Sequence, residues 1–224
     1  NWTNTHINTS IKNCLKWHTN NNKIDLNFYK YLIDIAFNDP FTEKWYKYCY
    51  SREAAQDKLT GDITPEYSTL PSEGIDYLIE LLTKKVKIIY IIREPLERAL
   101  SQLKMNVSRN SVFNEKDINH WIKAADDSEI LQRGDYKTYL PTWRSKIQKE
   151  NLFVIPYNLV KTDPKKLLNS IESFLNLSHH TYNLPSEIIH KTQEIIVPDQ
   201  IKNMLSEKLR DQSEFYSTIK YNIT

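Results

Sequence analysis

The chain has 224 residues, 40% of them hydrophobic and 26% charged, and its formal net charge is only +2. This length predicts one domain over residues 1–224 with a sizeable core, and the weak net charge argues against a nucleic-acid-binding protein. The two cysteines are too few for a disulfide framework or a zinc site, and no ligand cluster indicates a metal. No apolar run approaches the roughly 20 residues of a membrane span and no signal peptide opens the chain, so we expect a cytoplasmic protein.

The first third of the chain is predicted to be mainly helical. Apolar residues at three- and four-residue spacing indicate helices over about 27–37 and 41–50, and a further helix is expected over 2–15. A short strand is expected before Gly61, and residues 72–83 have the pattern of an amphipathic helix.

Two short apolar runs have the pattern of strands in a parallel sheet. Residues 86–92 (VKIIYII) and 151–157 (NLFVIPY) are continuous apolar runs, typical of strands buried on both faces. A helix is predicted to start at Pro95, another spans 163–177 after an aspartate and a proline, and a last one covers 198–209. Strands that alternate with helices predict an α/β fold with a mainly parallel sheet.

Arg93 follows the first of these strands, at the edge of an α/β sheet where ligands collect. Its guanidinium offers a planar fork that matches a phosphate group. Ser101 comes eight positions later on the predicted helix, where its hydroxyl can turn towards the same place. Arg98 can either reach this pocket or pair with Glu94 or Glu97. The alternative is an ordinary strand and helix with solvated charges.

The pattern Arg-x-Pro-x-x-Arg-x-x-Ser after an apolar strand resembles the 3′-phosphate motif of PAPS-dependent sulfotransferases. Three further segments resemble that family in order and spacing, so that the resemblance covers about residues 40–210: GDITPEY (61–67), GDYKTYLPTW (134–143) and the run from 152 to 177. The resemblance implies a three-layer, P-loop-NTPase-like fold. It also implies sulfuryl transfer by in-line displacement from PAPS to a hydroxyl or amine, with PAP as the product and a small molecule or a carbohydrate as the acceptor. Arg93 and Ser101 would then hold the 3′-phosphate of the cofactor.

The family also has a first strand followed by a glycine-containing 5′-phosphosulfate loop, which this chain lacks. The sequence contains only three glycines, far apart, so we expect that loop to lie upstream of residue 1. Two alternatives stay open. One is a degenerate, non-catalytic nucleotide-binding module of the same fold, and the other is a P-loop nucleotide kinase, which needs a Gly-x-x-x-x-Gly-Lys-(Ser/Thr) loop.

The catalytic base is expected to be His18, because an imidazole nitrogen can accept the proton of a hydroxyl group, or else Asp62, which replaces the glutamate of the family. The resemblance assigns Lys16, Thr64 and Tyr67 to the acceptor site. The sequence does not indicate which acceptor binds or what the oligomeric state is.

A segment near the C-terminus occupies the place of the family's basic loop over the cofactor. Lys191 is therefore expected to contact the 3′-phosphate, with His190 as the alternative and a solvated loop as the simpler interpretation. Trp143 is expected to be a core residue, whereas Tyr136 fits either the core or a cleft wall.

Overall fold

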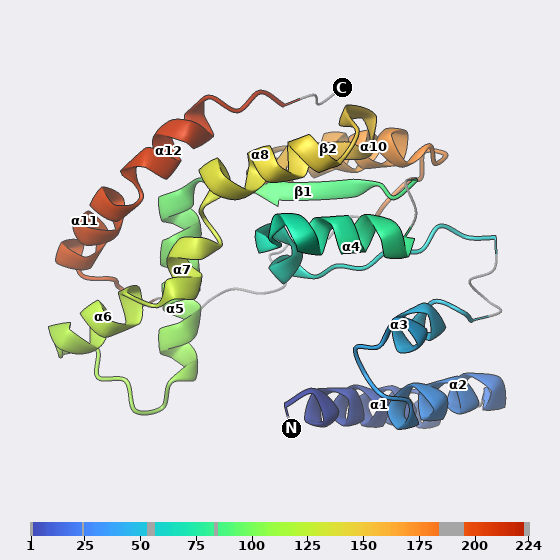
Figure 1. Cartoon of the computed structure of the whole chain (residues 1–224). Coiled ribbons are helices and arrows are strands. Elements are labelled where there is room, and N and C mark those ends of the chain that lie inside the picture. The colour runs from blue at the N-terminus through green and yellow to red at the C-terminus, as the bar shows by residue number, and fades with distance from the viewer. Residues whose placement is uncertain (1, 24, 53–56, 83–84, 184–194, 222–224) are drawn as a thin grey trace. The chain divides into compact units, whose positions relative to one another are not determined.

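The computed structural model describes residues 2–23, 25–52, 57–82, 85–183 and 195–221 (Figure 1). The chain divides into two compact units, Asn1–Thr64 and Pro65–Thr224. No helix in the described ranges is both long enough and apolar enough to cross a membrane.

The described residues of the first unit form the α-helices α1 (Trp2–Asn20), α2 (Leu26–Phe37) and α3 (Glu43–Cys49), and these confirm the helices predicted for this region. Two side chains cap the second and third of them, because Asp25 accepts a hydrogen bond from the backbone N–H of Phe28 and Thr42 accepts one from Trp45. The indole N–H of Trp45 also donates to the backbone oxygen of Ile35 over 3.1 Å, which holds α3 against α2.

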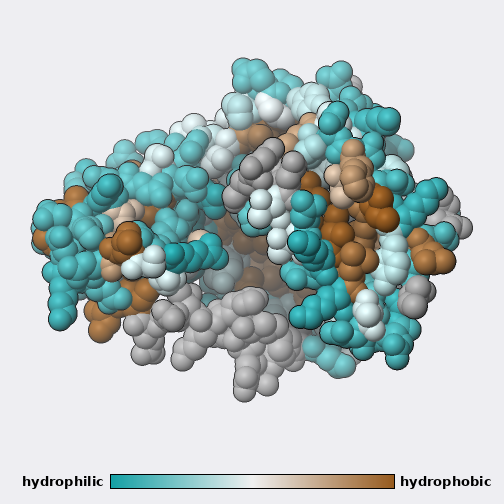
Figure 2. Space-filling model, turned by 90° about the horizontal axis from the view of Figure 1, so that it is seen from below, coloured by the Kyte–Doolittle hydropathy of each residue, from teal (hydrophilic) through white to brown (hydrophobic). Residues whose placement is uncertain are grey.

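Large apolar side chains of this unit stay at the surface. Neither α2 nor α3 contains a buried residue, and Phe37 and Phe41 are 86% and 74% exposed. Figure 2 shows apolar residues at the surface on the face that it views. The prediction of a strand before Gly61 is wrong over residues 57–60, where a turn at Asp57 and a bend at Lys58 are followed by two residues without regular secondary structure. Asp57 has a φ of 61° there, in the left-handed region, and a strand does not accommodate that conformation.

The second unit contains a two-stranded parallel sheet made of β1 (Ile88–Ile92) and β2 (Leu152–Pro156). Both strands and their parallel pairing confirm the prediction. Ile88 pairs with Leu152 and Ile92 with Pro156, so the two strands end together. The residues that directly follow the strands, Arg93 and Tyr157, therefore meet at one edge of the sheet.

Helices pack against both faces of the sheet. Tyr90, Ile92 and Val154 pack with α4 (Ser72–Leu82) and α8 (Tyr136–Lys146), where Trp143 is only 1% exposed and is a core residue as predicted. Phe153 and Ile155 pack on the other face with α10 (Pro164–Leu175). The prediction that β1 is buried on both faces is wrong at Ile91, which is 53% exposed, because the residues of α10 pack on β2 and Ile89 instead.

A second core lies along α5 (Pro95–Arg109), which starts beside the carboxyl end of β1 (Figure 1). Leu103 of this helix packs with Trp121, Ile130 and Leu205, which belong to the three helices α6 (Ile118–Ala125), α7 (Ser128–Gln132) and α11 (Asp199–Lys208). The helices predicted over 72–83, from Pro95, over 163–177 and over 198–209 are thus confirmed as α4, α5, α10 and α11.

The remaining described elements are short or were not predicted from the sequence. They are the 3-10 helices η2 (Pro65–Thr69) and η3 (Lys149–Asn151), and the helices α9 (Leu159–Thr162) and α12 (Arg210–Ser217). The second unit is therefore a mixed α/β structure with a small parallel sheet and many helices.

Candidate functional site

Arg93 is held at the strand end by its backbone and by its side chain. Its backbone N–H donates a hydrogen bond to the hydroxyl of Tyr136 over 3.1 Å. Its guanidinium lies over the ring of Tyr157, 5.1 Å from the ring centroid, and its Nε is 3.4 Å from a carboxylate oxygen of Glu97. The side chain is 25% exposed, so a partly shielded cation faces solvent at the carboxyl end of the sheet.

The turn from β1 into α5 is fixed by a capped helix start. Glu94 is the N-cap residue, and its carboxylate accepts a hydrogen bond from the backbone N–H of Glu97 over 2.7 Å. Pro95 occupies the first turn, where its missing N–H is not needed. The other carboxylate oxygen of Glu94 accepts a hydrogen bond from the hydroxyl of Ser213 in α12 over 2.8 Å. These contacts fix the orientation of α5 relative to Arg93, which directly precedes the helix cap.

Ser101 is half-buried on α5, and its hydroxyl forms no hydrogen bond to any residue in the described ranges. Serine in a helix usually donates back to a carbonyl of the preceding turn. Ser108, two helical turns further along α5, does so: its hydroxyl lies 2.9 Å from the backbone oxygen of Met105. The hydroxyl of Ser101 is therefore available to a ligand.

Arg98, the second arginine of the motif, has a structural position. Its guanidinium donates to the side-chain oxygen of Gln102 over 2.7 Å and to the backbone oxygen of Ile130, and it pairs with neither glutamate at the start of α5. Burial lowers the pKa of Arg98 from its ordinary value. A Cβ at Gly134 would lie 3.3 Å from Nε of Arg98, so glycine leaves the space that this side chain needs. The expectation that Arg98 pairs with one of those glutamates is therefore wrong, and its place in the pocket stays a prediction.

The segment around Gly134 also supplies the hydroxyl that supports Arg93. Tyr136 is 3% exposed, which makes it a core residue, and burial raises the pKa of its phenol. Asp135 caps α8 by accepting from the backbone N–H of Thr138 and receives a second hydrogen bond, of 2.6 Å, from the side chain of Gln212 in α12. Tyr136 is thereby positioned at the helix start, directly beneath the strand end.

Residues 65–67, the part of the GDITPEY segment (61–67) that belongs to the second unit, precede contacts to the same region. A carboxylate oxygen of Glu66 lies 2.6 Å from the guanidinium of Arg133. The hydroxyl of Tyr90 in β1 donates to the backbone oxygen of Ser68 over 2.9 Å. Tyr67 is half-buried, and in the sequence it stands between Glu66 and Ser68, the two residues that make these contacts. Segments that lie far apart in the sequence are therefore linked around the carboxyl end of β1.

His18, the first candidate for the base, lies in the first unit and has a defined tautomer. Its Nδ1 is 2.9 Å from the backbone oxygen of Lys23, and a carbonyl oxygen can only accept, so Nδ1 carries a proton. The basic atom of the neutral ring is then Nε2. The half-buried imidazole lies against the rings of Trp17, Phe28 and Tyr29, with centroids 4.9 to 6.0 Å away.

Asp62, the other candidate base, is exposed and already accepts hydrogen bonds on both oxygens. The hydroxyl of Thr64 donates over 2.8 Å and the hydroxyl of Tyr46 over 3.3 Å. Lys16 is exposed on α1. His18, Asp62, Lys16 and Thr64 belong to the first unit, whereas Arg93, Ser101 and Tyr67 belong to the second.

The sequence interpretation missed Tyr157 as a neighbour of Arg93. The signal was present, because this residue ends the second predicted strand and parallel strands end side by side. Lys191 and His190 lie outside the residues that the structure describes.

Comparison with known proteins identifies the family. A family model described as the sulfotransferase domain matches residues 67–217, which is more than half of the chain. The match includes the strand end, α5, and the segments that carry Gly134 and Tyr136. A search of curated proteins found no match. The chain therefore belongs to the sulfotransferase domain family, a class of transferases that move a sulfuryl group to an acceptor.

Proposed function

We propose that this protein transfers the sulfuryl group of PAPS to a hydroxyl or amine of a small molecule or carbohydrate. The donor is supported by two observations on neighbouring elements: Arg93 has a positioned guanidinium at the strand end, and Ser101 has an unengaged hydroxyl on the helix that follows. In this proposal both units belong to one domain with the three-layer, P-loop-like arrangement of the family. PAPS supplies the activated sulfuryl group.

The residues at the strand end suit a phosphate monoester. A guanidinium can donate two parallel hydrogen bonds to phosphate oxygens, and a serine hydroxyl can add a third. The only ion pair of Arg93 within the described residues is with Glu97, whose side chain is 65% exposed at 3.4 Å. Such exposed pairs contribute about 0–1 kcal/mol, so a phosphate can replace this one at little cost. Lys191 would add a further positive charge.

His18 is the base that the local geometry favours. Its Nδ1–H is engaged by a carbonyl, which leaves Nε2 as the atom that takes a proton from the acceptor. Asp62 is the second candidate, and both of its oxygens already accept hydrogen bonds. Lys16, Thr64 and Tyr67 are proposed to orient the acceptor.

Calorimetric titration with PAP and with 5′-AMP tests the proposed nucleotide site. The two ligands differ by the 3′-phosphate, so PAP should bind much more tightly than 5′-AMP. Arg93→Ala should weaken PAP binding by roughly tenfold or more, since hydrogen bonds to charged groups contribute about 1.5–3 kcal/mol, and should leave 5′-AMP binding unchanged.

Arg109→Ala is the matched control, because Arg109 is an exposed arginine in the last turn of the same helix. Equal binding of PAP and 5′-AMP by the folded protein would contradict the proposal. A non-catalytic module would show the PAP preference but no release of PAP from PAPS with any acceptor in a screen.

A further inference from the structure

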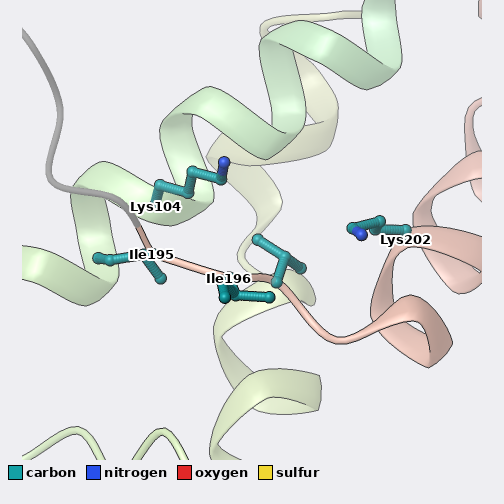
Figure 3. Close-up of a pocket in the computed structure, with 5 residues that line it drawn as sticks. Lys104, Ile195, Ile196 and Lys202 are labelled. Atoms are coloured by element: carbon teal, nitrogen blue, oxygen red, sulfur yellow. The ribbon is translucent and has the colours of Figure 1, made fainter.

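Lys104 lies on α5 one helical turn beyond Ser101 and lines a pocket of about 290 Å³. The other lining residues are Ile195, Ile196, Val197 and Lys202. Figure 3 shows Lys104 and Lys202 on opposite sides of this pocket, with the chain that carries Ile195 and Ile196 crossing between α5 and α11. The pocket thus combines an aliphatic wall with two ammonium groups.

The two lysines differ in how their charge is compensated. Nζ of Lys202 is 2.7 Å from a carboxylate oxygen of Asp199, one helical turn away. Lys104 is half-buried and makes no hydrogen bond or ion pair with any residue in the described ranges. A partly buried cation without a counter-charge favours an anion, because the ligand supplies the missing partner.

The helix geometry places this cation next to Ser101. Residues three apart on a helix are neighbours on one face, with Cβ atoms about 5–6 Å apart. Long helical side chains also lean towards the N-terminus and cover the preceding turn, and Ser101 belongs to that turn. Glu97, one turn further back, is engaged with Arg93.

We propose that Lys104 and this pocket form a subsite for a phosphate or sulfate monoester, contiguous with Ser101. Lys104 would bind the oxyanion, and Ile196, which is 84% exposed, would contact the organic body of the ligand. This inference rests on the proposed function. The oxyanion has two possible sources within that function, namely the 3′-phosphate of the cofactor itself or a charged group on the acceptor.

The test compares wild type with Lys104→Met, which keeps the aliphatic length and removes the charge. Lys104→Arg keeps the charge and should preserve binding. Lys149→Met is the matched control, because Lys149 is exposed in η3 at the start of β2. Each protein is titrated with PAP and with 5′-AMP, and the PAP-saturated protein is then titrated with p-nitrophenyl sulfate. Circular dichroism verifies that the variants are folded.

If the cofactor supplies the oxyanion, Lys104→Met weakens PAP binding by about tenfold and leaves 5′-AMP binding unchanged. If the acceptor supplies it, PAP binding is unchanged and p-nitrophenyl sulfate binding weakens by a similar factor. Unchanged affinity for both ligands in a folded Lys104→Met protein, with PAP still preferred over 5′-AMP, overturns the subsite alone. Failure of wild type to prefer PAP overturns the proposed function and the subsite with it.

Discussion

Tyr136→Phe removes one hydroxyl from beneath the strand end and tests whether that hydroxyl supports Arg93. The backbone N–H of Arg93 donates to this hydroxyl over 3.1 Å, and Tyr136 is 3% exposed. The substitution keeps the ring and leaves the N–H without a partner. An unsatisfied buried donor costs about 1–3 kcal/mol, and the partial exposure of Arg93 places the expected loss in the lower half of that range.

Tyr139→Phe is the control on the same helix. The hydroxyl of Tyr139 accepts from the exposed side chain of Gln132 over 2.9 Å, and water can replace it, so the loss should be below about 0.5 kcal/mol. Urea unfolding gives both values, with unchanged slopes showing that the transitions are comparable. PAP affinity should fall in Tyr136→Phe, by less than in Arg93→Ala. Equal stability of the two variants would refute the reasoning.

Three further predictions concern single carboxylates and the candidate base. Glu97→Gln should tighten PAP binding by about two- to fivefold in calorimetry, because it removes a carboxylate that competes with the phosphate for the guanidinium of Arg93. Weaker binding of PAP by this variant would mean that the phosphate does not bind at Arg93. His18→Asn should lower the rate of PAP release from PAPS by about 10²–10⁴-fold if His18 is the base, and the same loss in Asp62→Asn alone would identify Asp62 instead. The pKa of the Glu172 carboxyl group is lowered from its ordinary value of 4.5, and the hydrogen bond from Tyr182 is the largest cause. The ionised carboxylate therefore stabilises the folded protein above pH 4.5, and this stabilisation is lost as the pH falls through the lowered pKa. The melting temperature should therefore drop in acid more for wild type than for Glu172→Gln.

Local sequence patterns predicted those strands and helix starts that are specified by the residues within them. The runs at 86–92 and 151–157 are too short and too rich in branched residues to form helices, and they became the two parallel strands. Pro95 and Pro164 mark the true starts of α5 and α10. These patterns act over a few residues, so a sequence is enough to detect them.

Helix α8 was not predicted, because Pro141 lies inside it. Its formation depends on tertiary packing, since Leu140 and Trp143 are buried against the sheet and this burial outweighs the lost backbone hydrogen bond. Helix α12 was missed for a related reason. Its role lies in contacts from Gln212 and Ser213 to the caps of α8 and α5, and those caps are far away in the sequence.

The sequence by itself determined the family motif and the position of Arg93 at the end of a strand, because an apolar run, a proline and fixed spacings are local properties of the chain. Only the tertiary structure decided what the neighbouring residues do. Arg98 has the same side chain as Arg93, yet its half-buried guanidinium donates to the backbone oxygen of Ile130 and lies against Gly134. Packing between segments more than 30 positions apart engages the guanidinium of Arg98 with the backbone of α7, whereas that of Arg93 lies over the ring of Tyr157 at the strand end, and no local pattern records that difference.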